Sequence, residues 1–146
     1  MTPVSSTLTV LVVSCQGRTV AIPREVVSTI AVVVASPPLP LAQPWVGGVA
    51  NLPEGPGLLV QPFGMADGAA PTRSLTAVGL RLPVATAVAL VVEGTATLGE
   101  ATLLPAGPRA SVACPAGWLR PARLADGRDL IVLMPEAITS TLREAA

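Results

Sequence analysis

Two segments of the sequence, each headed by one of its only two tryptophans, follow the same plan. Trp45 begins an apolar run that ends at Leu52, and Trp118 begins a run that ends at Leu124. In both halves a turn follows, and after it comes a short aliphatic strand, which aligns Leu52 with Leu124 and Val60 with Val132. Apolar strands that resemble one another by chance would not also share tryptophan spacing and turn length. The pattern therefore predicts a duplicated unit.

The apolar stretches between the loops are short, rich in β-branched residues and bounded by Gly, Pro or Asn, which is typical of strands. Gln16 and Gly17 supply a tight turn and so predict that the chain opens with a hairpin. Pro135 starts a short terminal helix in which Ile138 and Leu142 share a face. The strands are expected at residues 8–14, 19–22, 30–35, 45–52, 58–60, 75–82, 84–92, 95–104 and 130–133.

Each half, of about 65 residues, would bury only roughly 60% of its unfolded surface if it folded alone. Two such halves packed together, with their strands closed into small barrels, would leave few exposed strand edges. We therefore expect an all-β fold, with residues 1–146 forming one domain of two small β-barrel subdomains. The first subdomain is expected at 7–62, a linker at 63–73, the second subdomain at 74–134 and the helix at 135–143.

The residue types that are missing argue against an enzyme. The sequence contains no His, Lys or Tyr, which removes the commonest general base, the usual zinc ligand and the phosphate-binding lysine. Cys15 and Cys114 are too few for a metal site, and Glu93 and Asp67 show no paired-carboxylate spacing. We expect no catalysis, no cofactor and no metal, and two reduced thiols. Cys114, beside Pro115 in an expected loop, should be the more reactive thiol.

The charge balance and the hydropathy pattern predict the cellular location of the protein. Nine arginines balance nine acidic residues, so the formal net charge is zero and no basic excess attracts nucleic acid or anionic lipid. The uncharged run over residues 26–53 is broken by prolines and is not a membrane span. No positive residue precedes the lipobox-like residues 12–15, so a signal peptide is not expected. We expect a cytoplasmic protein that does not insert into membranes.

Several conspicuous residues have two interpretations each. Trp45 and Trp118 could anchor a partner or form a wall between a barrel and a loop. Asn51 could contact a partner or cap the turn that follows it. Val27 and Leu52 could line a groove or belong to the core. A modest positive face is formed by Arg120, Arg123 and Arg128. It is expected to stay solvated, with Asp126 and Asp129 beside it.

Four segments in series resemble the CheW-like coupling domain of bacterial chemotaxis systems. They read GRTVAIPREVV at residues 17–27, WVGGVANL at 45–52, ALVVE at 89–93 and, after Trp118, DGR at 126–128. Each segment is short, but together they cover nearly the whole chain in the family's order.

The resemblance implies a non-catalytic adaptor built from two SH3-like β-barrel subdomains. Members of the family connect the cytoplasmic tips of chemoreceptors, the methyl-accepting chemotaxis proteins, to the regulatory domain of the histidine kinase CheA. By motif match, the residues implied in partner binding are Val27, Gly48, Val49, Asn51 and Leu52.

The sequence also departs from the family pattern. Where the family has Arg after Asn-Leu, this chain has Pro53, so a contact made by a guanidinium cannot come from this position. Gln61 replaces the usual Asp, and Arg120 replaces the expected Gly. Two alternatives therefore stay open beside the adaptor. One is a divergent member that binds receptor but not kinase and acts as a cluster spacer or decoy. The other is a small-ligand-binding double β-barrel.

Overall fold

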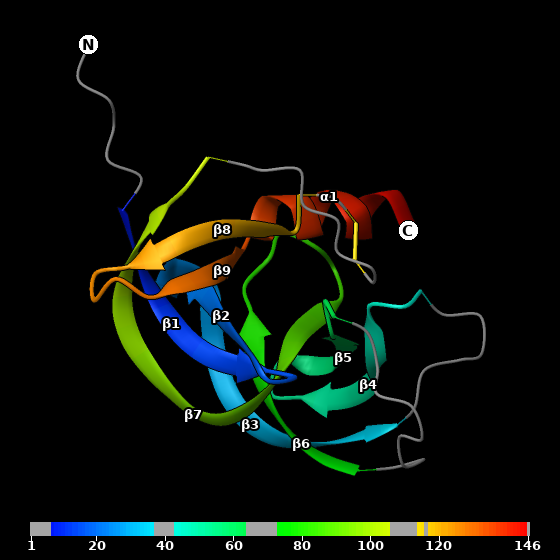
Figure 1. The fold of residues 1–146 in the computed structure, drawn as a ribbon. Coiled ribbons are helices and arrows are strands. Elements are labelled where there is room, and N and C mark those ends of the chain that lie inside the picture. Colours follow the sequence, from blue (N-terminus) through cyan, green and yellow to red (C-terminus); the bar gives the residue numbers. More distant parts are fainter. Residues whose placement is uncertain (1–6, 37–42, 64–72, 106–113, 116, 146) are drawn as a thin grey trace.

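The computed structural model describes residues 7–36, 43–63, 73–105, 114, 115 and 117–145 (Figure 1). The expected proline-rich loop and linker lie largely outside these residues. In chain order the elements are β1 (Thr7–Cys15), β2 (Arg18–Pro23), the 3-10 turn η1 (Arg24–Val26), β3 (Val27–Ser36), β4 (Val46–Leu52), β5 (Gly55–Val60), β6 (Arg73–Leu80), β7 (Ala87–Leu103), β8 (Leu119–Leu124), β9 (Asp129–Leu133) and α1 (Pro135–Ala145). The all-β expectation is confirmed, with one terminal helix.

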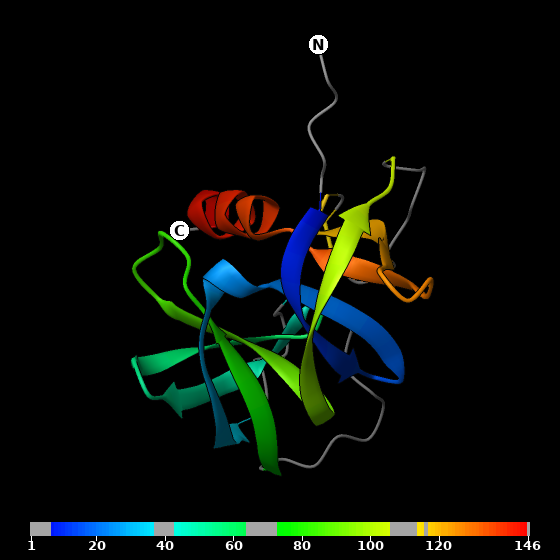
Figure 2. The same ribbon diagram turned by 90° about the vertical axis from the view of Figure 1, so that its left-hand side faces the viewer.

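The strands close into two rings that share β7. The order in the sheet is β1-β2-β9-β8-β7-β5-β4-β3-β6, and β1 and β6, at its two ends, both also pair with β7. Ring A therefore consists of β1, β2, β9, β8 and the second part of β7. Ring B consists of β5, β4, β3, β6 and the first part of β7. Figures 1 and 2 show the two rings side by side, with α1 at one end of the molecule. Closing the sheet on itself removes its exposed edges.

One long strand, β7, replaces two strands that were expected at 84–92 and 95–104. Its first part pairs with β5 and β6 and its second part with β8, while β1 pairs along the middle and the end of β7. Gly94 lies between the two parts with a φ of 69°. Only glycine adopts this backbone conformation at little cost, so β7 can bend there and pass from one ring to the other.

The two sequence repeats exchange hairpins in space. The β1–β2 hairpin of the first repeat completes ring A with strands of the second repeat, and the β6–β7 hairpin of the second completes ring B with strands of the first. Val13 pairs with Val20 in one hairpin, as Leu80 pairs with Val88 in the other. The rings thus do not coincide with the expected subdomains at 7–62 and 74–134, because each ring draws strands from both.

Equivalent backbone contacts show how the repeats align. The amide of Gln61 donates to the carbonyl of Trp45 over 2.7 Å, and the amide of Met134 donates to that of Trp118 over 2.7 Å. By these contacts Val60 is the structural equivalent of Leu133 and not of Val132. The sequence-based alignment is therefore wrong by one residue at this point. Both Val60 and Leu133 belong to the same buried cluster.

Three apolar clusters form the core. One fills ring A and includes Leu124, a second fills ring B and includes Leu52, and the largest lies between the rings. In the cluster between the two β-rings lie the buried indole groups of Trp45 and Trp118. Their centroids are 4.9 Å apart and their planes are inclined at 53°. The tryptophans are therefore part of the inter-ring wall, and the alternative that they anchor a partner directly is wrong.

The helix and the first turn follow the sequence-based expectations. Gln16 and Gly17 have φ of 53° and 78°, as a tight hairpin turn requires, and α1 starts at Pro135. Ile138 of α1 is fully buried between the rings, and the Nε1 of Trp118 donates to Thr141 Oγ1 over 2.9 Å. These contacts attach α1 to the junction of the two rings.

Candidate partner-binding surface

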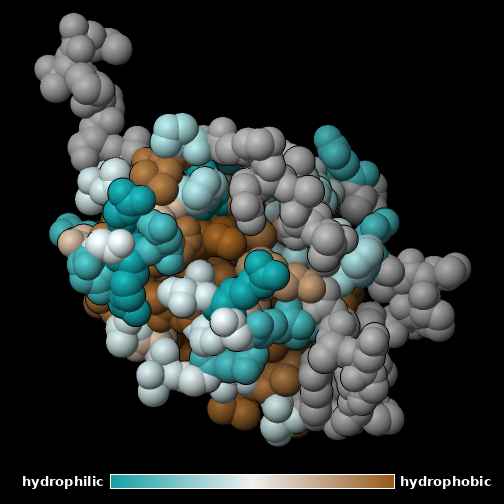
Figure 3. Space-filling model, viewed as in Figure 1, coloured by the Kyte–Doolittle hydropathy of each residue, from teal (hydrophilic) through white to brown (hydrophobic). Residues whose placement is uncertain are grey.

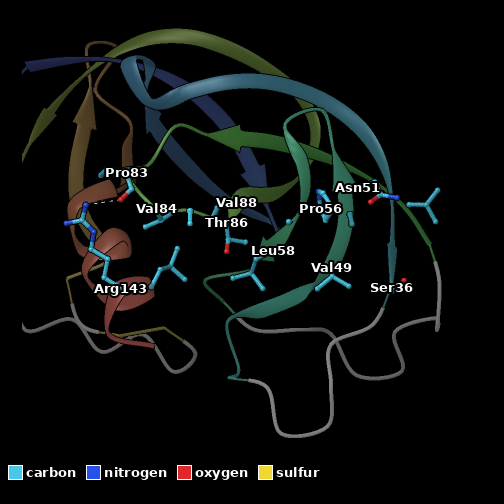
Figure 4. Close-up of a pocket in the computed structure, with 15 residues that line it drawn as sticks. Ser36, Val49, Asn51, Pro56, Leu58, Pro83, Val84, Thr86, Val88 and Arg143 are labelled. Atoms are coloured by element: carbon cyan, nitrogen blue, oxygen red, sulfur yellow. Dashed lines mark hydrogen bonds between the residues drawn. The ribbon is translucent and has the colours of Figure 1, made fainter. Parts of the chain in front are cut away.

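An apolar pocket lies between ring B and the end of α1 (Figure 4). It has a volume of about 790 Å³ and is formed by β3, β4, β5, the start of β7, the loop between β6 and β7, and α1. Its aliphatic lining includes Val34, Val49, Leu58, Val84, Val88 and Leu142. Its polar lining consists of Ser36, Asn51, Thr86 and Arg143.

A stripe of exposed aliphatic side chains runs along β3 and continues into this pocket. Ile30, Val32 and Val34 are 50%, 74% and 61% exposed, and neighbouring Val49 of β4 is 51% exposed. Alternate residues of a strand face opposite sides, so these three side chains point outward while Val33 fills ring B. Figure 3 shows hydrophobic side chains reaching the surface between hydrophilic ones on one face of the molecule. Contiguous exposed apolar surface of this kind is typical of interaction sites.

The five residues implied by motif match have different environments. Val49 and Asn51 are exposed and line the pocket together. Val27 is half-buried and packs against the cluster between the rings. Gly48 and Leu52 are buried, the latter in the core of ring B. Val49 and Asn51 are therefore accessible on this surface, Val27 is partly accessible, and Gly48 and Leu52 are not.

Gly48 is required by the backbone beside this surface. Its φ is 123°, and the pairing of β4 with β5 shifts register between Val46 and Gly48. A β-bulge at this point turns the following residues, and a side chain at Gly48 would strain the backbone. The bulge therefore decides that Val49 and Asn51 face outward and that Leu52 faces the core.

The turn after Asn51 is tied to the start of β3. Glu54 Oε2 accepts a hydrogen bond from Ser28 Oγ over 2.6 Å, and Pro53 is exposed beside it. The side chain of Asn51 makes no hydrogen bond to another described residue, so the structure does not favour the capping interpretation. The turn presents a carboxylate where the resembling family presents a guanidinium.

Two of the three arginines of the β8–β9 hairpin are neutralised locally. Arg123 pairs with Asp129 and Arg128 with Asp126, each over 2.9 Å. Hydrogen bonds from the backbone and the side chain of Arg128 lower the pKa of Asp126. Arg120 donates instead to the carbonyl of Leu104, so the hairpin keeps one arginine without a carboxylate partner among the described residues. The expected positive face is thus reduced to one charge, and exposed pairs of this kind contribute little stability.

The described titratable groups do not gather into a candidate metal site. Within the part of the chain that the structure describes, no group of three or more His, Cys, Asp or Glu could hold a metal. Burial, with a contribution from Glu93, raises the pKa of the Cys15 thiol to about 12, and its Sγ donates to the carbonyl of Val91. Cys114 is also buried, so it does not have the exposure that a more reactive thiol needs. No described helix is long and apolar enough to span a bilayer.

The exposed stripe on β3 and the contributions of α1 were not anticipated from the sequence. Residues 30–35 are almost uniformly aliphatic, so no alternation between polar and apolar positions distinguishes the outer face from the inner one. Leu142 and Arg143 meet Val49 across the pocket only because of the tertiary fold.

Two closed β-rings that share the strand β7 are also the fold of a solved scaffolding protein. The solved structure of the scaffolding protein TtCheW from Thermoanaerobacter tengcongensis is similar to this chain, with a TM-score of 0.59 and 13% sequence identity, and the match covers 87% of this chain and 88% of that one. No protein-family model and no curated protein matches the sequence significantly. The likeness at this identity is one of fold, and it agrees with the resemblance in the sequence motifs.

Proposed function

We propose that this protein is a non-catalytic cytoplasmic adaptor of a chemotaxis-like pathway, which couples the tip of a chemoreceptor to the regulatory domain of a CheA-type histidine kinase. The fold shared with a scaffolding protein over most of both chains carries this proposal. The missing His, Lys and Tyr support it, because they exclude the commonest catalytic groups.

The proposed partner surface is the outer face of β3 together with the accessible residues of β4. Val32, Val34 and Val49 supply aliphatic contact area, and Asn51 supplies unpartnered hydrogen-bonding groups at its edge. Val27, Gly48 and Leu52 act by holding this surface in shape. Because the surface lacks charge, binding should depend weakly on salt and rest on shape and burial.

A receptor-only spacer is the second candidate function. Pro53 and Glu54 favour it, since they place a rigid residue and a carboxylate where the resembling family offers a guanidinium. A partner that presents acidic groups to this turn would be repelled by Glu54. The two candidates differ in one observable, which is binding to the kinase.

Titration calorimetry against a receptor-tip fragment and a CheA-type regulatory domain tests the proposal. We expect micromolar affinity, about 8 kcal/mol, for both partners at two salt concentrations. Val32→Asp should weaken binding of at least one partner, because it places a charge in the middle of the apolar surface. Thr102→Asp, on an exposed strand position of ring A, is the matched control.

Each outcome of this titration has a distinct meaning. Binding of the receptor fragment alone would support the spacer, and Pro53→Arg should then strengthen kinase binding if the turn keeps its shape. Absence of binding to both partners by a folded protein would contradict the adaptor proposal. Equal effects of Val32→Asp and Thr102→Asp would contradict the assignment of the surface.

A further inference from the structure

The pocket between α1 and ring B has a shape and a charge distribution that adaptor binding does not explain. It is elongated, with Pro83 and Arg143 at one end and Ser36 and Asn51 at the other (Figure 4). Its volume of about 790 Å³ lies within the range typical of small-molecule sites.

The walls between the two ends are aliphatic. Val84, Leu58 and Val49 follow one another from the α1 end toward β3, and Val88 also lines the pocket. None of the described residues that line the pocket is acidic. Such a lining favours a flexible hydrocarbon chain and would penalise a second buried charge on the same ligand.

Arg143 supplies the single positive charge among these lining residues. Its Nη2 donates to the carbonyl of Pro83 over 2.8 Å, which fixes the guanidinium at the end of the pocket. The salt bridges of the described residues join Arg123 to Asp129 and Arg128 to Asp126, so Arg143 has no carboxylate partner there. Its remaining N–H donors are available to an anion, and a carboxylate matches guanidinium geometry.

We propose that this pocket binds a linear aliphatic monocarboxylate, with its carboxylate on Arg143 and its hydrocarbon chain along Val84, Leu58 and Val49. The pocket shares Val49 with the proposed partner surface, but the inference rests on the lining of the pocket and not on the adaptor function. An elongated apolar space with one cation at its end matches a ligand with one charged end and one apolar end.

Calorimetry with dodecanoate, kept below its micellar concentration, tests the proposal on the full chain. We expect saturable binding of one molecule per chain, and we expect amide chemical shifts of Gly57 and Val88 to change with the same midpoint. Arg143→Gln should weaken binding about tenfold or more, since it removes a charge-assisted hydrogen bond. Dodecanol, which lacks the charge, should bind wild type more weakly than dodecanoate does.

Two further variants separate the pocket from general surface effects. Val49→Asp places a charge against the hydrocarbon chain of the ligand and should weaken binding, while Thr102→Asp on ring A should not. Arg24→Gln removes an exposed arginine that does not line the pocket, and it should leave the affinity for dodecanoate unchanged. Circular dichroism of each variant confirms that it is folded.

Three results would overturn the proposal. The first is a lack of saturation by dodecanoate. The second is an unchanged affinity in folded Arg143→Gln and Val49→Asp, or an equal loss in both arginine variants. The third is a set of shift changes away from the pocket, which would indicate adventitious binding of an amphiphile.

Discussion

Truncation of Leu52 to alanine should destabilise the protein rather than weaken a partner interface directly. The side chain is only 6% exposed and packs in the core of ring B with Leu59 and Ala77. The motif resemblance places Leu52 among partner-binding residues, but its contacts are internal. The variant therefore distinguishes a residue that touches a partner from one that shapes the surface.

The expected cost is about 3 kcal/mol in the free energy of unfolding, within the range for buried Leu→Ala changes. The value combines the lost burial of aliphatic atoms and the cavity left behind. Gly57 faces the same side chain, since a Cβ at Gly57 would lie 2.6 Å from a methyl of Leu52. With the backbone this close, the site cannot collapse easily around an alanine, so the cavity should persist.

Leu124→Ala gives an internal comparison. Leu124 is the repeat-equivalent residue, is also 6% exposed and packs in the core of ring A. Because the environments correspond, the two variants should lose similar stability. Val32→Ala, at a 74% exposed position, should change stability by less than about 0.5 kcal/mol and serves as the control.

Urea denaturation followed by tryptophan fluorescence measures these values, because Trp45 and Trp118 lie in the cluster between the rings. For a chain of this size we expect the thermal midpoint of Leu52→Ala to fall by roughly 6–12 °C. A loss below about 1 kcal/mol for Leu52→Ala, together with a direct loss of partner affinity, would refute the assignment of Leu52 to the core.

Four further predictions concern the two thiols, the core between the rings and the backbone. Stability should fall as the pH rises from about 9 toward 12, because the pKa of the Cys15 thiol is the ordinary 9.0 in the unfolded chain and about 12 in the folded protein; denaturation curves should lose this dependence in Cys15→Ala. Native Cys15 and Cys114 should both react slowly with a thiol reagent, and rapid labelling of either without denaturant would contradict their burial. Thr141→Val should cost about 1–2 kcal/mol by leaving the Trp118 indole N–H without its partner, whereas an unchanged midpoint would show that water replaces the hydroxyl. Gly48→Ala should cost about 1–3 kcal/mol because of its positive φ, and wild-type stability would show that the bulge relaxes.

Local signals in the sequence predict the local structure well. The Gln16–Gly17 turn and the start of α1 depend on residues adjacent in the chain, and both are confirmed. The two tryptophan-led segments likewise fold alike, each as a strand, a turn and a strand, because these signals lie within each half. The one-residue error at Val60 arises because the sequence does not show how the bulge at Gly48 and the following turn divide their extra residues.

The arrangement of these elements in space could not be predicted in the same way. Which hairpin completes which ring depends on pairings between strands far apart in sequence. Rings with exchanged hairpins and rings built from one repeat each would satisfy the same alternation of apolar residues. The candidate site shows the same limit. Asn51 and Leu52 are neighbours in one motif, yet one is exposed and the other is buried, and the contribution of Arg143 requires the docked helix.

Because the two halves exchange hairpins, neither half of the chain can complete a ring without the other during folding. Neither ring can close until β6 and β7 have been synthesised, although the first five strands contain much of ring B. A polypeptide that ends after β5 thus contains two incomplete rings instead of one complete ring. Separate fragments that end after β5 and begin before β6 should consequently stay unfolded alone and assemble when mixed, each supplying the hairpin that the other lacks.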